Sequence, residues 1–288
     1  MRTFVSALSV LLAVVLTAAA APALWLQQNV ADEGGFVSLL EPMARDTDLQ
    51  SALVGDLDTA VLANSGIPAV ARPVAAKALD GVAKSLVSDP GFPKAWSETL
   101  RQSHQLNFTP ATAAANGFQL QLQPMTALLV SKLGSAIGVP LPSPGSLEVQ
   151  VGTAQQRSWV TGAEDFSRLA EQLALGAILA FALGLLIARH RGAALAGTGL
   201  GLLVVAAAYR LASGLIPAAV SAQGTSGSLS STFGARAAEL AVTSFEPWIG
   251  NVAIAGAALF VAGTVAEIAR RLGRRRRDAR DEVASMES

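Results

Sequence analysis

Four long, strongly apolar runs without a charged side chain are the feature that most constrains this sequence. They cover residues 4–26, 172–188, 192–209 and 247–266. A helix needs about 17–25 residues to cross the hydrocarbon core of a bilayer, and each run has that length. A segment in lipid must also satisfy its own backbone hydrogen bonds, which a helix does. The sequence therefore predicts four transmembrane helices.

The first run has an alternative interpretation. Arg2, the apolar stretch behind it and the Ala-Pro-Ala sequence at residues 21–23 resemble a cleavable signal peptide. The apolar region of a signal peptide is usually about 7–15 residues long, and this run is longer. We interpret it as a retained anchor, with cleavage near Leu24 as the alternative. Mass spectrometry of the mature N-terminus distinguishes the two.

Arginines mark one side of the predicted membrane. One precedes the first run, two lie in the short link between the second and third runs, and a cluster follows the fourth. Cytoplasmic flanks are enriched in Lys and Arg, and four spans return the C-terminus to the side of the N-terminus. We therefore expect a plasma-membrane protein with both termini in the cytoplasm. The topology residues are Arg2, Arg189, Arg191, Arg270, Arg271, Arg274 and Arg275.

This topology defines the fold class that we expect. It is a mainly α membrane protein with four transmembrane helices, a mostly helical extracytoplasmic domain and a small two-stranded β element. The predicted parts are an N-terminal anchor (1–26), the extracytoplasmic domain (27–168), a three-helix membrane region (169–268) with an outer loop (212–246), and a basic cytoplasmic tail (269–288).

Helical periodicity dominates the predicted extracytoplasmic domain. Leu49, Leu53, Leu57 and Val61 recur every four residues, which places them on one face of a helix. Thr47 and Gln50 precede this face with a capping-box pattern, Thr-x-x-Gln. Residues 68–87 continue in a similar pattern, with valine or leucine at 70, 74, 82 and 86. Both segments are expected to be helices.

A third helix is expected to follow Asp89 and Pro90, an N-cap residue and a proline suited to the first helical position. After it, residues 118–122 and 147–151 alternate apolar and polar side chains, as half-buried strands do. Between the two strands, apolar residues at 125, 128, 129, 133 and 137 indicate a helix, and the proline-rich residues 140–145 indicate a turn. The two strands are expected to pair as a ribbon.

The candidate binding residues lie on and beside one face of this third helix. Phe92, Trp96 and His104 share that face, and Arg101 lies between them in the sequence. His104 is the only histidine in the predicted extracytoplasmic domain. It can serve as a ligand or as a proton-responsive group. The alternative, which we favour, is a partly buried ring with one nitrogen in a hydrogen bond.

Arg210 lies at the outer end of the third run and has two interpretations. Its side chain can extend to the membrane interface, which reduces the cost of a charge in lipid. Alternatively, it pairs with Glu239 or Glu246 of the outer loop and holds that loop in place. The loop itself contains a Ser- and Gly-rich flexible linker at residues 221–231 and a predicted short surface helix at residues 235–243.

Two other features within or beside the spans suggest helix contacts. Gly197 and Gly201 form a Gly-x-x-x-Gly pair, a pattern found where membrane helices pack closely. Glu267 precedes Arg270 and Arg271 by three and four residues, a spacing that favours a local ion pair. The arginine-rich tail has two interpretations, a topology anchor or a site for anionic lipid.

Composition argues against several functional classes. Residues 27–168 carry 13 acidic and 9 basic side chains, so their net charge is −4, which disfavours nucleic acid as a partner. The chain has no cysteine, which excludes disulfides and thiolate metal sites. It also lacks the His-Glu-x-x-His, Gly-x-Ser-x-Gly and Walker patterns. We therefore expect no cofactor, no metal and no enzymatic activity.

The sequence Asp-Pro-Gly-Phe-Pro-Lys-Ala-Trp at residues 89–96, followed by Arg101 and His104, carries a family resemblance. It resembles a pattern in uncharacterised actinobacterial integral membrane proteins, Asp-Pro-x-Phe-x-x-x-Trp followed by Arg-x-x-His. Those proteins are similar in plan, with an N-terminal anchor, a helical outer domain and a helical bundle that ends in a basic tail. The resemblance implies the same topology and supplies no activity.

Taken together, these features predict a non-catalytic plasma-membrane protein. Its extracytoplasmic domain is expected to bind a partner or to sense a condition of the cell envelope. The alternative is an accessory subunit of a transporter or an envelope-assembly complex. In either case the expected partners are the lipid bilayer and another protein.

Overall fold

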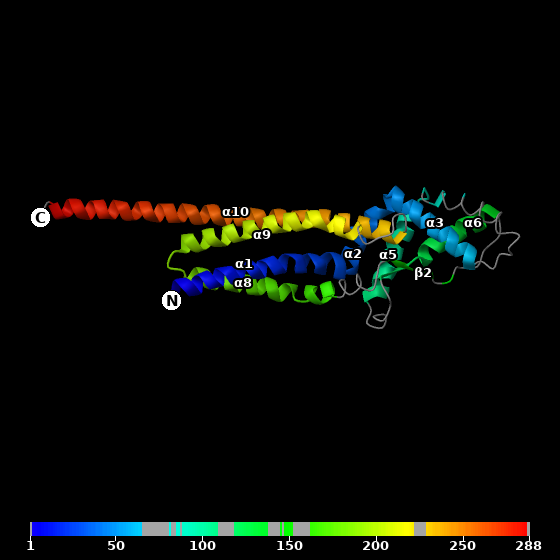
Figure 1. The fold of residues 1–288 in the computed structure, drawn as a ribbon, viewed down its shortest axis with the longest axis horizontal. Coiled ribbons are helices and arrows are strands. Elements are labelled where there is room, and N and C mark those ends of the chain that lie inside the picture. The colour runs from blue at the N-terminus through cyan, green and yellow to red at the C-terminus, as the bar shows by residue number, and fades with distance from the viewer. Residues whose placement is uncertain are drawn as a thin grey trace. The chain divides into compact units, whose positions relative to one another are not determined.

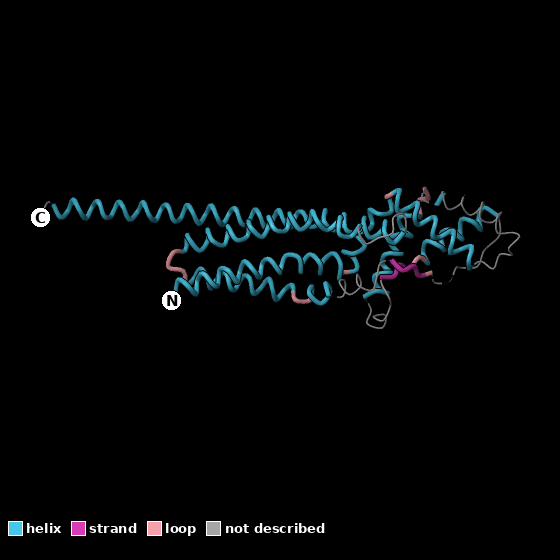
Figure 2. Tube along the Cα trace, viewed as in Figure 1, coloured by secondary structure: helices cyan, strands magenta, loops and turns pink. Residues whose placement is uncertain are grey.

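The computed structural model describes residues 2–64, 81, 85–86, 88–108, 118–137, 145, 147–151, 162–221 and 229–286. Figure 1 shows the fold, and Figure 2 shows that helices make up most of it. The helices and strands are α1 (Arg2–Leu26), η1 (Gln27–Ala31), α2 (Glu33–Leu40), η2 (Glu41–Arg45), α3 (Thr47–Asn64), α5 (Phe92–Phe108), β1 (Phe118–Gln121), α6 (Gln123–Ile137), β2 (Glu148–Val151), α8 (Ala170–Ile187), α9 (Arg191–Ser221) and α10 (Leu229–Met286).

The chain divides into two compact units. The first, which we call the four-helix unit, comprises Met1–Trp25, Phe166–Gly214 and Phe245–Ser288. The second, which we call the ribbon unit, comprises Leu26–Asp165 and Leu215–Ser244. The chain crosses from one unit to the other four times, and the last crossing falls within α10.

The four-helix unit contains the four helices that the apolar runs predict. α1, α8, α9 and α10 are each long and apolar enough to cross a membrane. Their outward faces carry large aliphatic side chains, such as Leu179 and Val204, which are mostly exposed. The unit is thus apolar on its outside as well as inside, as expected of helices surrounded by lipid. The prediction of four apolar helices of membrane-spanning length is confirmed.

Side-chain contacts give the direction of each helix within the four-helix unit. Ser6 Oγ near the start of α1 donates a hydrogen bond of 2.8 Å to the carbonyl oxygen of Gly184 near the end of α8. These two helices therefore run antiparallel. α9 runs in the same direction as α1, since its Tyr209 hydroxyl donates to the carbonyl oxygen of Ala18 at 2.5 Å. α1, α8 and α9 run side by side in Figure 1.

α9 and α10 are antiparallel and approach closely through glycines. A Cβ atom at Gly192 would lie 2.8 Å from the carbonyl oxygen of Gly263, and one at Gly199 would lie 2.5 Å from that of Gly256. The two contacts repeat after seven residues on both helices. Because glycine has no side chain, the two backbones can approach closely at each of these points.

The predicted strand pair is present in the ribbon unit. β1 and β2 pair antiparallel, with Phe118 opposite Val151 and Gln121 opposite Glu148. The backbone N–H of Leu122 extends the ribbon by donating to the carbonyl oxygen of Leu147 at 2.8 Å. α6 connects the strands, as the sequence predicts.

One hydrophobic core holds the ribbon unit together. Its buried members come from α2, η2, α3, α5, the ribbon, α6 and the start of α10. The largest side chains that are fully buried include Trp96, Met43, Leu49, Leu53, Leu86, Leu100, Leu120, Leu122, Met125, Leu129 and Leu229. The sequence pattern at Leu49 and Leu53 is thus confirmed as a core face.

The second outer segment differs from the surface helix expected at residues 235–243. α10 already begins at Leu229, and both Leu229 and Phe233 are buried in the core of the ribbon unit. Ala237 and Leu240 pack against the same core. These four residues follow one another at intervals of four, four and three, which gives the helix an apolar face. The segment is therefore part of the core rather than a surface addition.

Two helix starts also differ from the sequence prediction. Asp46, not Thr47, caps α3, because the Asp46 carboxylate accepts from the N–H of Leu49 at 2.8 Å. Gln50 donates instead to the carbonyl oxygen of Ala44 at 2.6 Å. Asp89 and Pro90 lie in a turn before α5, which begins at Phe92. A capping pattern thus predicts a helix start better than it predicts the capping residue.

Several predicted elements lie outside the described residues. They are the side chains of Leu57 and Val61, most of the pattern at 68–87, most of the proline-rich turn at 140–145 and most of the linker at 221–231. Of the apolar residues predicted at 68–87, Leu86 is described, and it is fully buried.

Candidate functional site

The predicted binding face of α5 points into the core of the ribbon unit. Phe92 and Leu100 are buried there, and Trp96 is 0% exposed. The Trp96 indole N–H donates to the carbonyl oxygen of Leu40 at 3.1 Å, and the ring meets that of Phe233 edge-on at 6.5 Å. The contacts of Phe92 and Trp96 are those of core side chains, and this face does not form a surface for a partner.

His104 extends the same buried face and is 7% exposed. Its ring stacks on Phe108 at 4.3 Å and lies 5.2 Å from Phe36. Nε2 lies 3.1 Å from the carbonyl oxygen of Val30. A carbonyl oxygen only accepts, so Nε2 carries a proton in this contact. The geometry matches the interpretation of His104 as a packed ring with one nitrogen in a hydrogen bond.

Arg101 is the one member of the candidate set that reaches solvent, with 43% of its side chain exposed. Its guanidinium lies 3.3 Å from the Glu33 carboxylate on α2 and 2.5 Å from that of Glu98 on α5. Gln105 also donates to Glu33, at 2.9 Å. Arg101 therefore links α5 to α2 at the surface of the ribbon unit.

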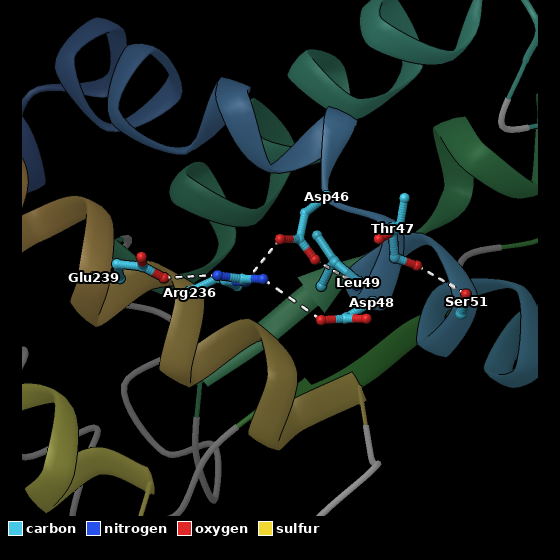
Figure 3. A network of polar contacts seen from close by, with 7 residues as sticks. All are labelled: Asp46, Thr47, Asp48, Leu49, Ser51, Arg236 and Glu239. Atoms are coloured by element: carbon cyan, nitrogen blue, oxygen red, sulfur yellow. Dashed lines mark hydrogen bonds and ion pairs between the residues drawn. The ribbon is translucent and has the colours of Figure 1, made fainter.

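Arg236, which belongs to none of the sequence motifs, forms an ion-pair network in the ribbon unit (Figure 3). Its Nε lies 2.7 Å from Asp46, Nη2 lies 3.5 Å from Asp48 and Nη1 lies 2.8 Å from Glu239. The same Asp46 caps α3. One guanidinium thus joins α10 to the start of α3, between residues that are about 190 positions apart in the chain. Only Glu239, three residues away on the same helix, could have been anticipated from the sequence.

Asp89 forms a second polar junction in the ribbon unit. One oxygen of its carboxylate accepts from the N–H of Gly91 at 2.7 Å, and the other pairs with Lys132 on α6. The Lys132 ammonium is the main cause that holds the pKa of the Asp89 carboxyl below its ordinary value, and the Gly91 N–H adds to it. Partial burial opposes these effects without cancelling them. The charged form of Asp89 is therefore the one that the fold stabilises.

We expect this junction to lose its stabilising effect in acid. A depressed carboxyl pKa contributes stability above the unfolded-state pKa, and this contribution disappears as the pH falls through the folded-state pKa. The difference in free energy of unfolding between the wild type and Asp89→Asn should thus be constant near pH 6–7 and shrink below about pH 4. Urea unfolding at a series of pH values measures it. In a Lys132→Gln background the same difference should depend less on pH, and an unchanged dependence would contradict the assignment.

The predicted topology arginines gather at one end of the four-helix unit. The start of α1 lies beside the end of α8, and Gly192 at the start of α9 packs against Glu267 of α10. Glu267 forms the ion pairs predicted for it, with Arg270 at 2.5 Å and with Arg271 at 3.3 Å. The side chain of Arg275 lies outside the described residues. The remaining topology residues, Arg2, Arg189, Arg191 and Arg274, are exposed.

The opposite end of the four-helix unit carries aromatic residues and one ion pair. Phe245 contacts Trp25 at 5.8 Å and Tyr209 at 5.4 Å, both edge-on. Arg210 pairs with Glu246 at 2.5 Å, which was one of the two interpretations of this arginine. Both side chains are largely exposed, so the pair adds only about 0–1 kcal/mol of stability.

The glycine pair suggested by the sequence is half correct. A Cβ atom at Gly201 would lie 2.7 Å from Val14 of α1, so Gly201 faces a neighbouring helix. A Cβ atom at Gly197 would have no neighbouring heavy atom within 4 Å, so Gly197 faces away from the bundle. The close contacts between α9 and α10 use Gly192 and Gly199 instead.

Among the described residues, no group of three or more His, Cys, Asp or Glu side chains is placed to hold a metal ion. The structure is that of a mostly helical protein with a two-stranded antiparallel ribbon and four apolar helices compatible with a membrane. Comparison of the chain with protein-family models, curated proteins and solved structures found no match.

Proposed function

We propose that this chain is a non-catalytic integral plasma-membrane protein. The ribbon unit is its extracytoplasmic domain, which binds a protein partner or senses a condition of the cell envelope. The arginine end of the four-helix unit faces the cytoplasm. The aromatic end faces outward, since Trp and Tyr favour membrane interfaces.

The observation that carries this proposal is the way the ribbon unit is assembled. Its core takes side chains from the chain after α1 and from residues 229–240, which precede the apolar run of α10. Arg236 adds an ion-pair network between the same two parts of the chain. The chain also connects the ribbon unit directly with each of α1, α8, α9 and α10. A change in the core of the ribbon unit can therefore reach each of these helices through the chain. This arrangement suits a receptor or sensor domain.

A second candidate, an accessory subunit that docks within the membrane, is favoured by one face of α10. Asn251 is exposed there with Ala255, Ala258 and Ala262, which follow it at intervals of four, three and four residues. A polar side chain facing lipid is rare, and small residues allow another helix to approach. This face can hold a helix of a partner protein.

The orientation is tested by single-cysteine labelling, which the cysteine-free chain makes specific. A Lys94→Cys variant should react with a membrane-impermeant maleimide in intact cells. A His190→Cys variant, in the link between α8 and α9, should react only after the cells are opened. Both positions are exposed. The reverse pattern would contradict the proposed orientation.

The function is tested by photo-cross-linking in native membranes. A photoreactive residue replaces Lys94 or Glu148 on the ribbon unit, or Ile254 or Val261 on α10, all of which are exposed. A binding domain gives protein adducts from the first pair, while the second pair gives lipid adducts. Protein adducts from α10 alone would support the accessory-subunit function instead. Protein adducts from neither pair would contradict both a protein partner of the ribbon unit and the accessory-subunit function.

A further inference from the structure

The arginine end of the four-helix unit carries more positive charge than its own acidic groups neutralise. Its described arginines are Arg2, Arg189, Arg191, Arg270, Arg271 and Arg274, and Glu267 is the acidic side chain described beside them. Arg270 and Arg271 share Glu267. The other four arginines are exposed and form no ion pair with a described side chain.

These arginines come from separate parts of the chain and converge through backbone contacts. A Cβ atom at Gly192 would lie 3.0 Å from the backbone nitrogen of Glu267. Arg191 precedes Gly192, so the arginines of the link between α8 and α9, Arg189 and Arg191, lie at the level of Arg270 and Arg271. Close packing of α9 on α10 therefore joins two clusters that are about 80 residues apart in the sequence.

Large apolar side chains precede the charges on the same helices. Leu186, three residues before Arg189, is 69% exposed, and Ile268, two residues before Arg270 on α10, is 57% exposed. The surface therefore has two parts, guanidinium groups at the end of the unit and aliphatic side chains below them. A phospholipid has the same two parts, a phosphate and its acyl chains. A soluble phosphate ion would use only the first.

We propose that this end of the four-helix unit is a binding surface for anionic phospholipid, with the arginines at the lipid phosphate and the aliphatic side chains against the acyl chains. Arginine suits this role because its planar guanidinium binds phosphate oxygens in pairs. All four lysines of the chain lie elsewhere, at residues 77, 84, 94 and 132. The inference rests on the proposed membrane insertion and adds a lipid partner to it.

Selectivity for anionic lipid is measured with the full chain in lipid nanodiscs. The discs consist of phosphatidylcholine and contain a trace of spin-labelled phosphatidylglycerol or spin-labelled phosphatidylcholine. Electron paramagnetic resonance gives the fraction of each label that the protein immobilises. We expect the wild type to prefer phosphatidylglycerol and Arg189→Gln/Arg191→Gln to lose about fivefold of that preference for each charge that contacts the lipid. Arg189→Lys/Arg191→Lys should keep most of it.

The matched control is Arg45→Gln/Lys94→Gln, which removes two exposed positive charges from the ribbon unit. It should leave the preference unchanged, and soluble glycerophosphate should not compete. Equal immobilisation of the two lipids by the wild type would overturn the proposal, as would an equal loss in the control. A chain that does not enter the nanodiscs would instead contradict the membrane insertion on which the proposal rests.

Discussion

Replacing Trp96 by alanine should lower the free energy of unfolding of the ribbon unit by about 3–5 kcal/mol. The Trp96 side chain is fully buried and central to a core that includes Phe233 of α10. Its loss leaves a cavity, and it also leaves the carbonyl oxygen of Leu40 without the indole donor. Marginally stable domains have about 5–15 kcal/mol in total, so a large part of the stability is removed. Pulse proteolysis in urea measures this change on the full-length protein.

Two control variants separate packing from other effects of Trp96. Lys94→Ala, two residues away on the same helix and exposed, should change stability by less than about 0.5 kcal/mol. Trp96→Phe keeps much of the volume and loses the N–H donor. Its loss in free energy of unfolding should therefore lie between those of Trp96→Ala and Lys94→Ala. A Trp96→Ala variant as stable as Lys94→Ala would show that the face is not core. It would also restore the prediction that Trp96 contacts a partner.

Replacing Gly199 by valine should produce the largest defect in the four-helix unit. The new Cβ atom would overlap the backbone nitrogen of Phe260 and lie 2.5 Å from the carbonyl oxygen of Gly256, both on α10. Backbone atoms of a helix cannot retract as a flexible side chain can, so α9 and α10 must separate. Overpacking typically costs about 1–3 kcal/mol, and we expect the upper part of that range.

Gly197 supplies the matched control for this substitution. It lies two residues away on the same helix, and an added Cβ atom there would meet open space. Gly197→Val changes helix propensity and hydrophobicity as Gly199→Val does, so the two differ mainly in their contact with α10. Thermal unfolding in detergent, monitored by size-exclusion chromatography, should show a lower Tm for Gly199→Val alone. Equal Tm values for both variants would contradict the close contact between α9 and α10.

The candidate site shows what the periodicity of apolar residues can predict and what it cannot. The spacing of Phe92, Trp96 and His104 correctly predicts one helix face. It does not say whether that face binds a partner or packs in the core, because both uses favour the same aromatic residues. The contacts with Leu40, Val30 and Phe108 decide for the core. The interpretation of His104 as a packed ring agrees with these contacts. It rested on the absence of a second histidine or cysteine that could bind a metal ion together with His104.

Glycines within the spans show a different limit. Residues that face lipid and residues that face another helix are both apolar or small, so hydrophobic periodicity fades inside a membrane helix. The sequence therefore predicts a contact at Gly197 and Gly201 without distinguishing them from Gly199. The rotation of α9 about its axis makes that distinction, and it depends on neighbours that are distant in the sequence.

What the sequence by itself determined is local. Strongly apolar, uncharged runs of sufficient length specify four apolar helices, alternation over four or five residues specifies β1 and β2, and a spacing of three specifies the pairing of Glu267 with Arg270. Each of these depends on residues that are close in the chain and on backbone hydrogen bonding that every residue shares.

Only the tertiary structure decided which surfaces cover one another. It placed Leu229 and Phe233 in the core of the ribbon unit, brought Arg236 to Asp46, and joined the link arginines to those after the fourth apolar run. These contacts join residues about 80 to 190 positions apart. An apolar face or an unpaired charge in a sequence shows that a partner is needed. It does not identify that partner, because many surfaces satisfy the same need and packing selects among them.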